Sequence, residues 1–421
     1  MPPVYHLYGT IVQKELTQTT MLRRIIYRLF QRRHYWRNLE FDEVAELYVS
    51  RLMTVFAINI INLFAAVYLY QLGYSLAFIA FFYAAIYAIK IPLSPMAGYL
   101  VAFLGPKRTI FIANLVRIPS LLFFLGVEEY GVLAVIAFGV VQQISSCLYD
   151  LAYHVNFSKV KNTQFAGKEI GIMHMLEKGA RVVAPVAGGV LATTVSPQAT
   201  IALAAVVFSL AAWPLFRSAE PTRTGLKLEM HRVRFRDLWR TFAGQGVVGF
   251  DFVTSGLAWT LFMTVIVFAN AGDNIYAVLG LIVSLGMVVS AAGAHAFGQM
   301  IDRRRGSALL TNAVILKSIV HMLRPISVTP LSAVANGFVS EVAATGQSMG
   351  FMRAMFDAAD SSPSRFAYMT YMQIAVNLGA TVACLVFGAA LWLGGEVGGF
   401  AALFIVAAFV QFLMLLSRRY A

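Results

Sequence analysis

Long apolar runs joined by short polar connections make up most of the chain. About 20 apolar residues are enough to cross the hydrocarbon core of a bilayer as an α-helix. Backbone groups in lipid must satisfy their own hydrogen bonds, so each run is expected to be helical. The pattern predicts an all-α membrane protein with twelve transmembrane helices, at 47–71, 75–104, 107–127, 131–157, 168–194, 197–217, 243–270, 274–301, 307–325, 329–357, 365–393 and 398–417.

The order of these runs repeats after 200 residues. The pairs at this offset are Gly98 with Gly298, Gly188 with Gly388, Arg117 with Lys317, Glu177 with Asn377, and Arg51 with Asp251. Internal repetition sets the architecture of a chain before local structure does. We therefore expect two pseudo-symmetric six-helix bundles, over 46–217 and 243–421. Residues 1–45 then form an N-terminal arm, and residues 218–242 form a basic linker.

Charge is scarce and unevenly placed. Only 13% of the residues are charged, against about 25% in a soluble domain. The net charge of +13 would suit nucleic acid, but most bases lie in the arm, the linker, the C-terminus and alternate connections. Cytoplasmic loops carry such an excess, which predicts cytoplasmic termini and a cell (inner or plasma) membrane location. The expected partner of these bases is anionic lipid rather than nucleic acid.

Within the arm, residues 21–37 place apolar positions at helical spacing between arginines. This pattern predicts a basic amphipathic helix lying on the cytoplasmic leaflet. The helix is either an anchor that fixes topology or an arm that regulates the protein or binds a partner.

Two short basic turns follow the second and the eighth predicted helix. The second turn holds Gly298, Asp302, Arg303 and Gly306, and the first holds Gly98, Ala102, Gly105 and Arg108. These turns resemble the signature loop of the major facilitator superfamily, as do the six-plus-six spans and the long basic linker, over about residues 46–417. The resemblance implies a secondary transporter that works by alternating access between two parallel repeats.

The same resemblance implies a gating role for Gly98, Gly105, Arg108, Gly298, Asp302 and Arg303. Asp302 would bind the N-terminus of a neighbouring helix in one conformation and release it in the other. Ala102 stands where the family has an acid, so the C-terminal copy would carry most of this gating. The alternative is a plain turn held in the cytoplasm by its arginines.

The fifth predicted helix concentrates ionisable residues. His174, Glu177, Lys178 and Arg181 are spaced by 3, 1 and 3 residues, which puts them on one helix face. A charge at the centre of a span costs about 2.5–3.5 kcal/mol, so such residues usually face the protein interior. The resemblance places this face beside a cavity shared with Gln373 and Asn377 of the eleventh span. The face is either a substrate- and proton-binding site or a structural ion pair.

Other polar residues lie near the ends or middles of spans. Lys90, just before Pro92 and Pro95, is expected to contact substrate or a counter-charge. Arg51, Asn59 and Asn62 share one face of the first span, and Arg51 and Asp251 are expected to meet as a gate between the halves. Arg353 and Asp357 are expected near the inner mouth. By the family resemblance, Arg117 and Lys317 lie at the outside of the bundle, where they pair or snorkel.

These residues favour a proton-coupled secondary transporter in which Glu177 carries the proton. Lys90, Lys178 and Arg181 favour an anionic or zwitterionic solute, and the many aromatic residues also permit an amphiphile. The alternatives are a lipid or glycolipid translocase and a membrane sensor or scaffold without transport. An enzyme is not expected, because the sequence has no phosphate loop and no nucleophile–base motif. We expect a monomer without cofactor or metal; Cys147 and Cys384 fall within spans and suggest no disulfide.

Overall fold

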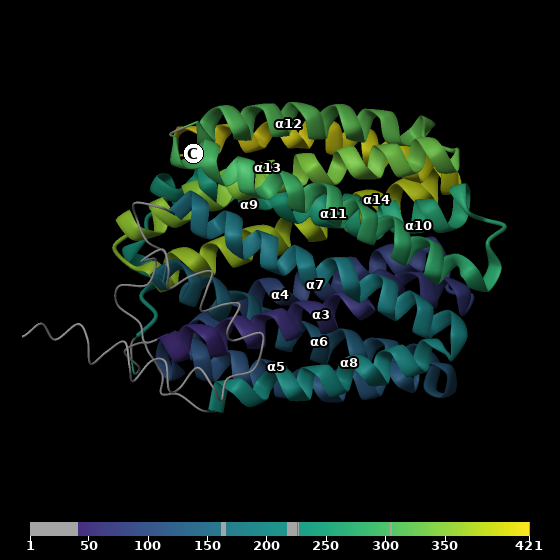
Figure 1. Cartoon of the computed structure of the whole chain (residues 1–421), viewed down its shortest axis with the longest axis horizontal. Coiled ribbons are helices and arrows are strands. Elements are labelled where there is room, and N and C mark those ends of the chain that lie inside the picture. Colours follow the sequence, from purple (N-terminus) through teal and green to yellow (C-terminus); the bar gives the residue numbers. More distant parts are fainter. Residues whose placement is uncertain (1–40, 161–165, 217–224, 226, 304, 421) are drawn as a thin grey trace, which may run out of the picture.

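The computed structural model describes residues 41–160, 166–216, 225, 227–303 and 305–420. Within these ranges the chain forms long helices that lie side by side, and no strand occurs in this part of the chain (Figure 1). The amphipathic helix expected at 21–37 lies outside the described residues.

The first group of helices, which we call the N-terminal set, follows the predicted spans closely. Side-chain and backbone chemistry explains its boundaries: the Ser75 and Ser196 hydroxyls cap helix N-termini, and Pro106 and Pro197 occupy first turns. The set contains α3 (Phe41–Gln71), α4 (Leu76–Leu104), α5 (Pro106–Leu125), α6 (Val127–Val160), α7 (Ala166–Thr194), α8 (Pro197–Ala212) and the 3-10 turn η3 (Trp213–Phe216).

The second group, the C-terminal set, begins inside the predicted linker. Its elements are α9 (Phe235–Phe252), the π-helix η5 (Val253–Ala258), α10 (Trp259–Phe262), the π-helix η6 (Met263–Val267), α11 (Ile275–Asp302), α12 (Gly306–Leu323), η8 (Arg324–Ile326), α13 (Pro330–Ser361), α14 (Arg365–Val410) and η9 (Gln411–Tyr420). Short 3-10 turns, η4 (Met230–Arg232) and η7 (Gly272–Asn274), precede α9 and α11. Arg236 and Arg240 interrupt the apolar run at its start, which is why the predicted span begins only at 243. Leu238 is nevertheless buried and holds the first turns of α9 in the core.

The chain reverses within α14. Gly395 has a φ of 68°, a left-handed conformation that favours glycine. The rings of Phe387 and Phe400 lie 5.1 Å apart, although 13 residues of straight helix would separate them by about 20 Å. The turn predicted between 393 and 398 is therefore present.

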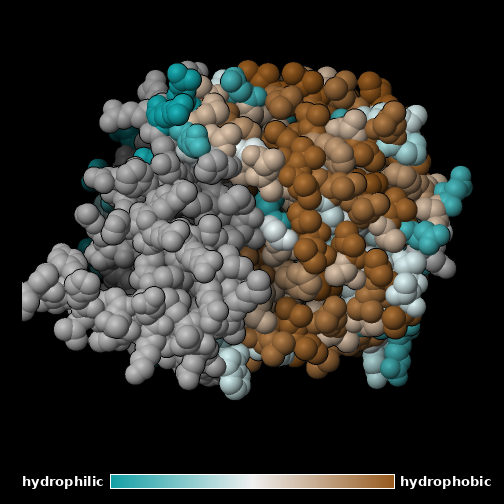
Figure 2. Space-filling model, viewed as in Figure 1, coloured by the Kyte–Doolittle hydropathy of each residue, from teal (hydrophilic) through white to brown (hydrophobic). Residues whose placement is uncertain are grey.

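The described surface has the apolar character of a lipid-facing protein. Eight helices of the described part are long and apolar enough to cross a membrane. Figure 2 shows a broad band of hydrophobic residues, with hydrophilic residues gathered toward the ends. On α11, for example, Leu281, Leu285 and Val288 are each about half exposed at helical spacing. These side chains present one face of that helix to the surroundings.

Two antiparallel helix crossings join the sets. On α7 and α11, a Cβ on Gly189 would lie 2.6 Å from the carbonyl oxygen of Tyr276, and one on Gly280 would overlap the carbonyl oxygen of Pro185. Small residues let helix backbones approach this closely. On α4 and α14, a Cβ on Gly98 would overlap the Thr370 hydroxyl, and Gly388 packs on the Phe81 ring. The 200-residue offset converts α4 into α11 and α7 into α14, so the two crossings are equivalent.

Within the C-terminal set, α9 and α14 touch through backbone atoms at Gly249. A Cβ there would overlap the carbonyl oxygen of Val376, whereas a Cβ on Gly256, farther along the same helical run, meets nothing within 4 Å. Overpacking of this kind costs about 1–3 kcal/mol or more. We expect Gly249→Ala to lower the thermal midpoint of the purified protein clearly and Gly256→Ala to leave it nearly unchanged. Equal midpoints for the two variants would contradict this packing.

Candidate functional site

Glu177 on α7 is the centre of a buried charge cluster in the N-terminal set. Its Oε1 atom accepts hydrogen bonds from Arg51 Nε at 2.8 Å and from the Tyr153 hydroxyl at 2.9 Å. Arg181 Nη2 lies 3.5 Å from Oε2. The Arg51 guanidinium also stacks on the Tyr153 ring at 3.7 Å and donates to the Tyr149 hydroxyl at 3.2 Å. Two bases therefore compensate one carboxylate that is only 5% exposed.

The prediction that Arg51 and Asp251 contact each other is wrong. Arg51 on α3 pairs with Glu177 in its own set, and Asp251 on α9 pairs with Lys317 in the other. A buried charge takes the nearest opposite charge, because leaving it uncompensated costs several kcal/mol. The repeat does not conserve these partners: Asn377 stands at the position equivalent to Glu177.

Lys90 on α4 has the counter-charge that was expected for it. Its Nζ atom lies 3.3 Å from Asp150 Oδ2 on α6. One turn later, the Ser94 hydroxyl donates to the Lys90 carbonyl oxygen at 2.7 Å and accepts a 3.5 Å bond from Asn377 Nδ2 on α14. Asn377 on α14 thus reaches α4 across the α4–α14 crossing. The nearby Gln373 is buried, and its Nε2 atom has no hydrogen-bond partner within the described part of the chain.

Arg117 and Lys317 are not at the outside of the bundle, as had been expected. Each is only 1% exposed. Arg117 on α5 donates to the hydroxyls of Ser145 and Ser146 on α6, at 2.9 and 3.0 Å. Lys317 on α12 lies 3.3 Å from Asp251 Oδ2, so its expected pairing is confirmed. Both bases face a neighbouring helix that offers polar partners, which removes the reason to snorkel.

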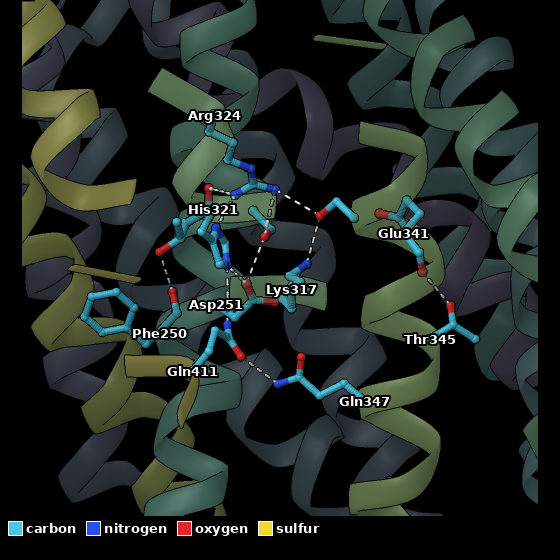
Figure 3. A network of polar contacts seen from close by, with 12 residues as sticks. Phe250, Asp251, Lys317, His321, Arg324, Glu341, Thr345, Gln347 and Gln411 are labelled. Carbon is cyan, nitrogen blue, oxygen red and sulfur yellow. Dashed lines mark hydrogen bonds and ion pairs between the residues drawn. The ribbon is translucent and has the colours of Figure 1, made fainter. Parts of the chain in front are cut away.

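A second buried cluster surrounds Asp251 in the C-terminal set (Figure 3). His321 Nε2 lies 2.8 Å from Asp251 Oδ1, and Arg324 Nη1 lies 3.0 Å from His321 Nδ1. A guanidinium can only donate, so Nδ1 accepts, and the proton of a neutral His321 sits on Nε2, where it donates to Asp251. Arg324 also donates to the hydroxyls of Ser255 and Ser340.

Sequence reasoning places Arg324 among the bases at a span end but assigns no site role to it or to His321. The signal was present: residues 317, 321 and 324 follow helical spacing, as do those that revealed the fifth span. It was overlooked because Lys317 had been placed at the outside of the bundle.

One ion pair joins a base of the N-terminal set to an acid of the C-terminal set. Lys178 Nζ on α7 lies 3.1 Å from Glu341 Oε2 on α13 and 3.3 Å from Met287 Sδ on α11. Glu341 also interacts electrostatically with Lys317 and Arg181. Charged groups thus follow one another from Arg51 to Arg324 through the interior of the protein.

Bases outnumber acids in these clusters. With His321 neutral, the seven bases and four acids of these clusters leave a net charge of +3. The bases are Arg51, Lys90, Arg117, Lys178, Arg181, Lys317 and Arg324, and the acids are Asp150, Glu177, Asp251 and Glu341. The described interior therefore favours an added anion over an added cation.

The remaining predicted residues have simpler surroundings. Asn59 Nδ2 donates to the Val55 carbonyl oxygen on its own helix at 2.7 Å, and Arg353 pairs with Asp357 along α13 at 2.8 Å. The side chains of Asn62, His174 and Asp302 lie outside the described part of the structure. Among the turn residues, Gly105 ends α4 with a φ of 91°, Gly298 is buried next to the end of α11, and Arg108 and Arg303 are exposed.

A bundle of long apolar helices with charge clusters buried between them defines a multi-pass α-helical membrane protein. The chain belongs to the Major Facilitator Superfamily, whose family model matches residues 47–383.

Many solved structures share the fold, and two of them illustrate the likeness. The human organic anion transporter MFSD10 (TETRAN) superimposes with a TM-score of 0.68 at 11% identity, over 91% of this chain and 100% of that chain. The E. coli fucose:proton symporter FucP gives 0.62 at 11% identity, over 90% and 98%. A search of curated protein sequences gave no match.

Proposed function

We propose that the protein is a secondary active transporter with twelve transmembrane helices in two six-helix bundles, 46–217 and 243–421. The run from α9 to η6 counts as one transmembrane helix. The run of α14 and η9 counts as two, because the chain reverses at Gly395. The equivalent α4–α14 and α7–α11 crossings support rocking of one bundle against the other about a central site. Asp302 and the glycines of the two turns then gate one mouth.

The proposed substrate is a small anion, with zwitterionic and amphiphilic solutes as the wider class. The observation that carries this choice is the excess of three positive charges in these clusters. Two of the bases, the buried Lys178 and the partly exposed Arg181, lie next to the junction between the sets. One structural neighbour is an organic anion transporter, although at this identity the likeness extends to the fold alone.

The proposed coupling ion is the proton, carried by Glu177. In the described state Arg51, Arg181 and Tyr153 all converge on its carboxylate. Protonation would remove the charge that holds the two arginines and free them to bind substrate or to let it go. The other structural neighbour is itself a proton symporter.

The protein is proposed to act as a monomer in the cell (inner or plasma) membrane, with both termini cytoplasmic. In support, Arg108 and Arg303 are exposed at the equivalent α4–α5 and α11–α12 connections, as cytoplasmic loops require. The basic arm would rest on anionic lipid.

The test is transport by the purified full chain in proteoliposomes. Radiolabelled benzoate, succinate, alanine, choline and fucose are offered with and without a pH gradient. We expect saturable uptake of an anion that an acidic outer compartment increases several-fold, and little uptake of choline. Absence of saturable uptake for every compound, or preference for the cation, would refute the proposal.

A further inference from the structure

We propose that Lys178 and Arg181 form the anion subsite of this transporter, and that the Glu341 carboxylate occupies the subsite until an anionic substrate displaces it. This inference rests on the proposed function and specifies its binding chemistry. Glu341 then acts as an internal counter-ion, and Lys178 is the base for which substrate and protein compete.

The two partners of the ion pair differ in accessibility. The Lys178 side chain is 8% exposed, whereas that of Glu341 is 32% exposed. The acid is therefore the partner that an incoming solute meets first. A carboxylate arriving along the same path offers Lys178 the same charge and the same oxygen ligand, so exchange leaves no base buried without a partner.

Donor capacity beside Lys178 is unused. Arg181, one turn along α7, makes one long 3.5 Å contact with Glu177. Its Nε atom is buried and has no hydrogen-bond partner among the described residues. A guanidinium offers a planar fork that suits a carboxylate with two parallel bonds. An anion on Lys178 would satisfy this donor, which the Glu341 carboxylate leaves unbonded.

The opposing helix adds a second unused group at the same level. Gly189 faces Tyr276, Gly280 faces Pro185, and Lys178 bonds Met287 across the antiparallel α7–α11 crossing. If the antiparallel pairing of Pro185 with Gly280 is continued by one helical turn, Ser284 on α11 lies opposite Arg181 on α7. The Ser284 hydroxyl is buried, and it too lacks a hydrogen-bond partner within the described part.

The displaced carboxylate has another base within range. Glu341 interacts electrostatically with Lys317, and Lys317 Nζ already bonds the hydroxyl of the adjacent Ser340 at 2.9 Å. Turning toward Lys317 moves Glu341 from a base of the N-terminal set to a base of the C-terminal set. Binding of an anion would thereby break the Lys178–Glu341 link between the sets and free them to move.

The experiment measures the thermal midpoint of the purified full chain during titration with sodium benzoate and sodium succinate. Sodium chloride keeps the ionic strength constant. We expect Glu341→Gln to reduce the half-maximal anion concentration about tenfold, because the internal competitor is gone. Lys178→Gln should lose the anion-dependent rise, alone and combined with Glu341→Gln. The exposed residues Glu129 and Lys227 supply matched controls as Glu129→Gln and Lys227→Gln.

Three results would overturn the inference. The first is an anion dependence of the thermal midpoint that is unchanged in Glu341→Gln. The second is a midpoint that still rises with anion in Lys178→Gln. The third is a midpoint that rises with neither anion, both in the wild-type protein and in Glu341→Gln. A merely structural pair would lower the midpoint in each single variant without changing the anion dependence. If the wild-type protein still moves either anion in proteoliposomes, the subsite fails and the transport proposal stands. If no compound of the transport test is moved, the proposed function itself fails.

Discussion

Glutamine in place of Glu177 is expected to abolish pH-driven uptake, by more than tenfold against the wild-type protein. The glutamine side chain keeps the shape of glutamate, and its carbonyl oxygen can still accept hydrogen bonds from the Tyr153 hydroxyl and Arg51 Nε. In the wild-type protein these two atoms lie 2.9 and 2.8 Å from Glu177 Oε1. Glutamine has no charge to hold the two arginines and no site for a proton. Uptake in proteoliposomes, with and without a pH gradient, measures the loss.

An exchange assay at equal pH on both sides separates coupling from binding. If Glu177 carries only the proton, exchange of labelled for unlabelled substrate continues in the glutamine variant. Glu396→Gln, at an exposed acid near the reversal of α14, serves as the control and should transport normally. Undiminished pH-driven uptake in Glu177→Gln would remove this residue from the mechanism.

Asparagine in place of Asp251 is expected to destabilise the protein by about 3–5 kcal/mol. Asn Oδ1 can still accept from His321, but Lys317 and Arg324 would remain buried without the acid that now compensates them. Both bases are 1% exposed and cannot reach water without repacking. The thermal midpoint of the purified protein measures the effect.

A second variant identifies the cause of this loss. Combining Asp251→Asn with Lys317→Met removes one of the stranded charges, so part of the stability should return. Residues in one ion-pair network interact in this non-additive way. A double variant as unstable as the sum of the two single variants, or a stable Asp251→Asn protein, would contradict the role assigned to this cluster.

The sequence predicts the helices well because an apolar run is a local property. The predicted limits 75–104 and 274–301 differ from those of α4 and α11 by at most one residue at each end. The start of α9 was missed because Arg236 and Arg240 break the apolar run, although tertiary packing of Leu238 continues the helix. Membrane crossing is therefore easier to predict than the ends of helices beyond the bilayer.

The sequence predicts which residues of the candidate site share a helix face, but not which residues they contact. Helical spacing identifies Glu177, Lys178 and Arg181 because it depends on a single helix. Their partners lie far along the chain, with Arg51 126 residues from Glu177 and Glu341 163 residues from Lys178. No local pattern encodes how helices rotate about their axes, so the internal repeat suggested a contact between Arg51 and Asp251 that does not form.

The glycine crossing of α7 and α11 bears on how two halves of a protein can separate. Near Gly189 and Gly280 the contacting groups include backbone atoms of both helices, so little side-chain interlocking has to be undone there. Each helix has already satisfied its own amide and carbonyl groups, so lipid or water entering near these glycines meets no orphaned backbone group. Parting here forfeits mainly dispersion contacts, which re-form when the helices close again. The α7–α11 contact near these glycines can therefore open and close repeatedly.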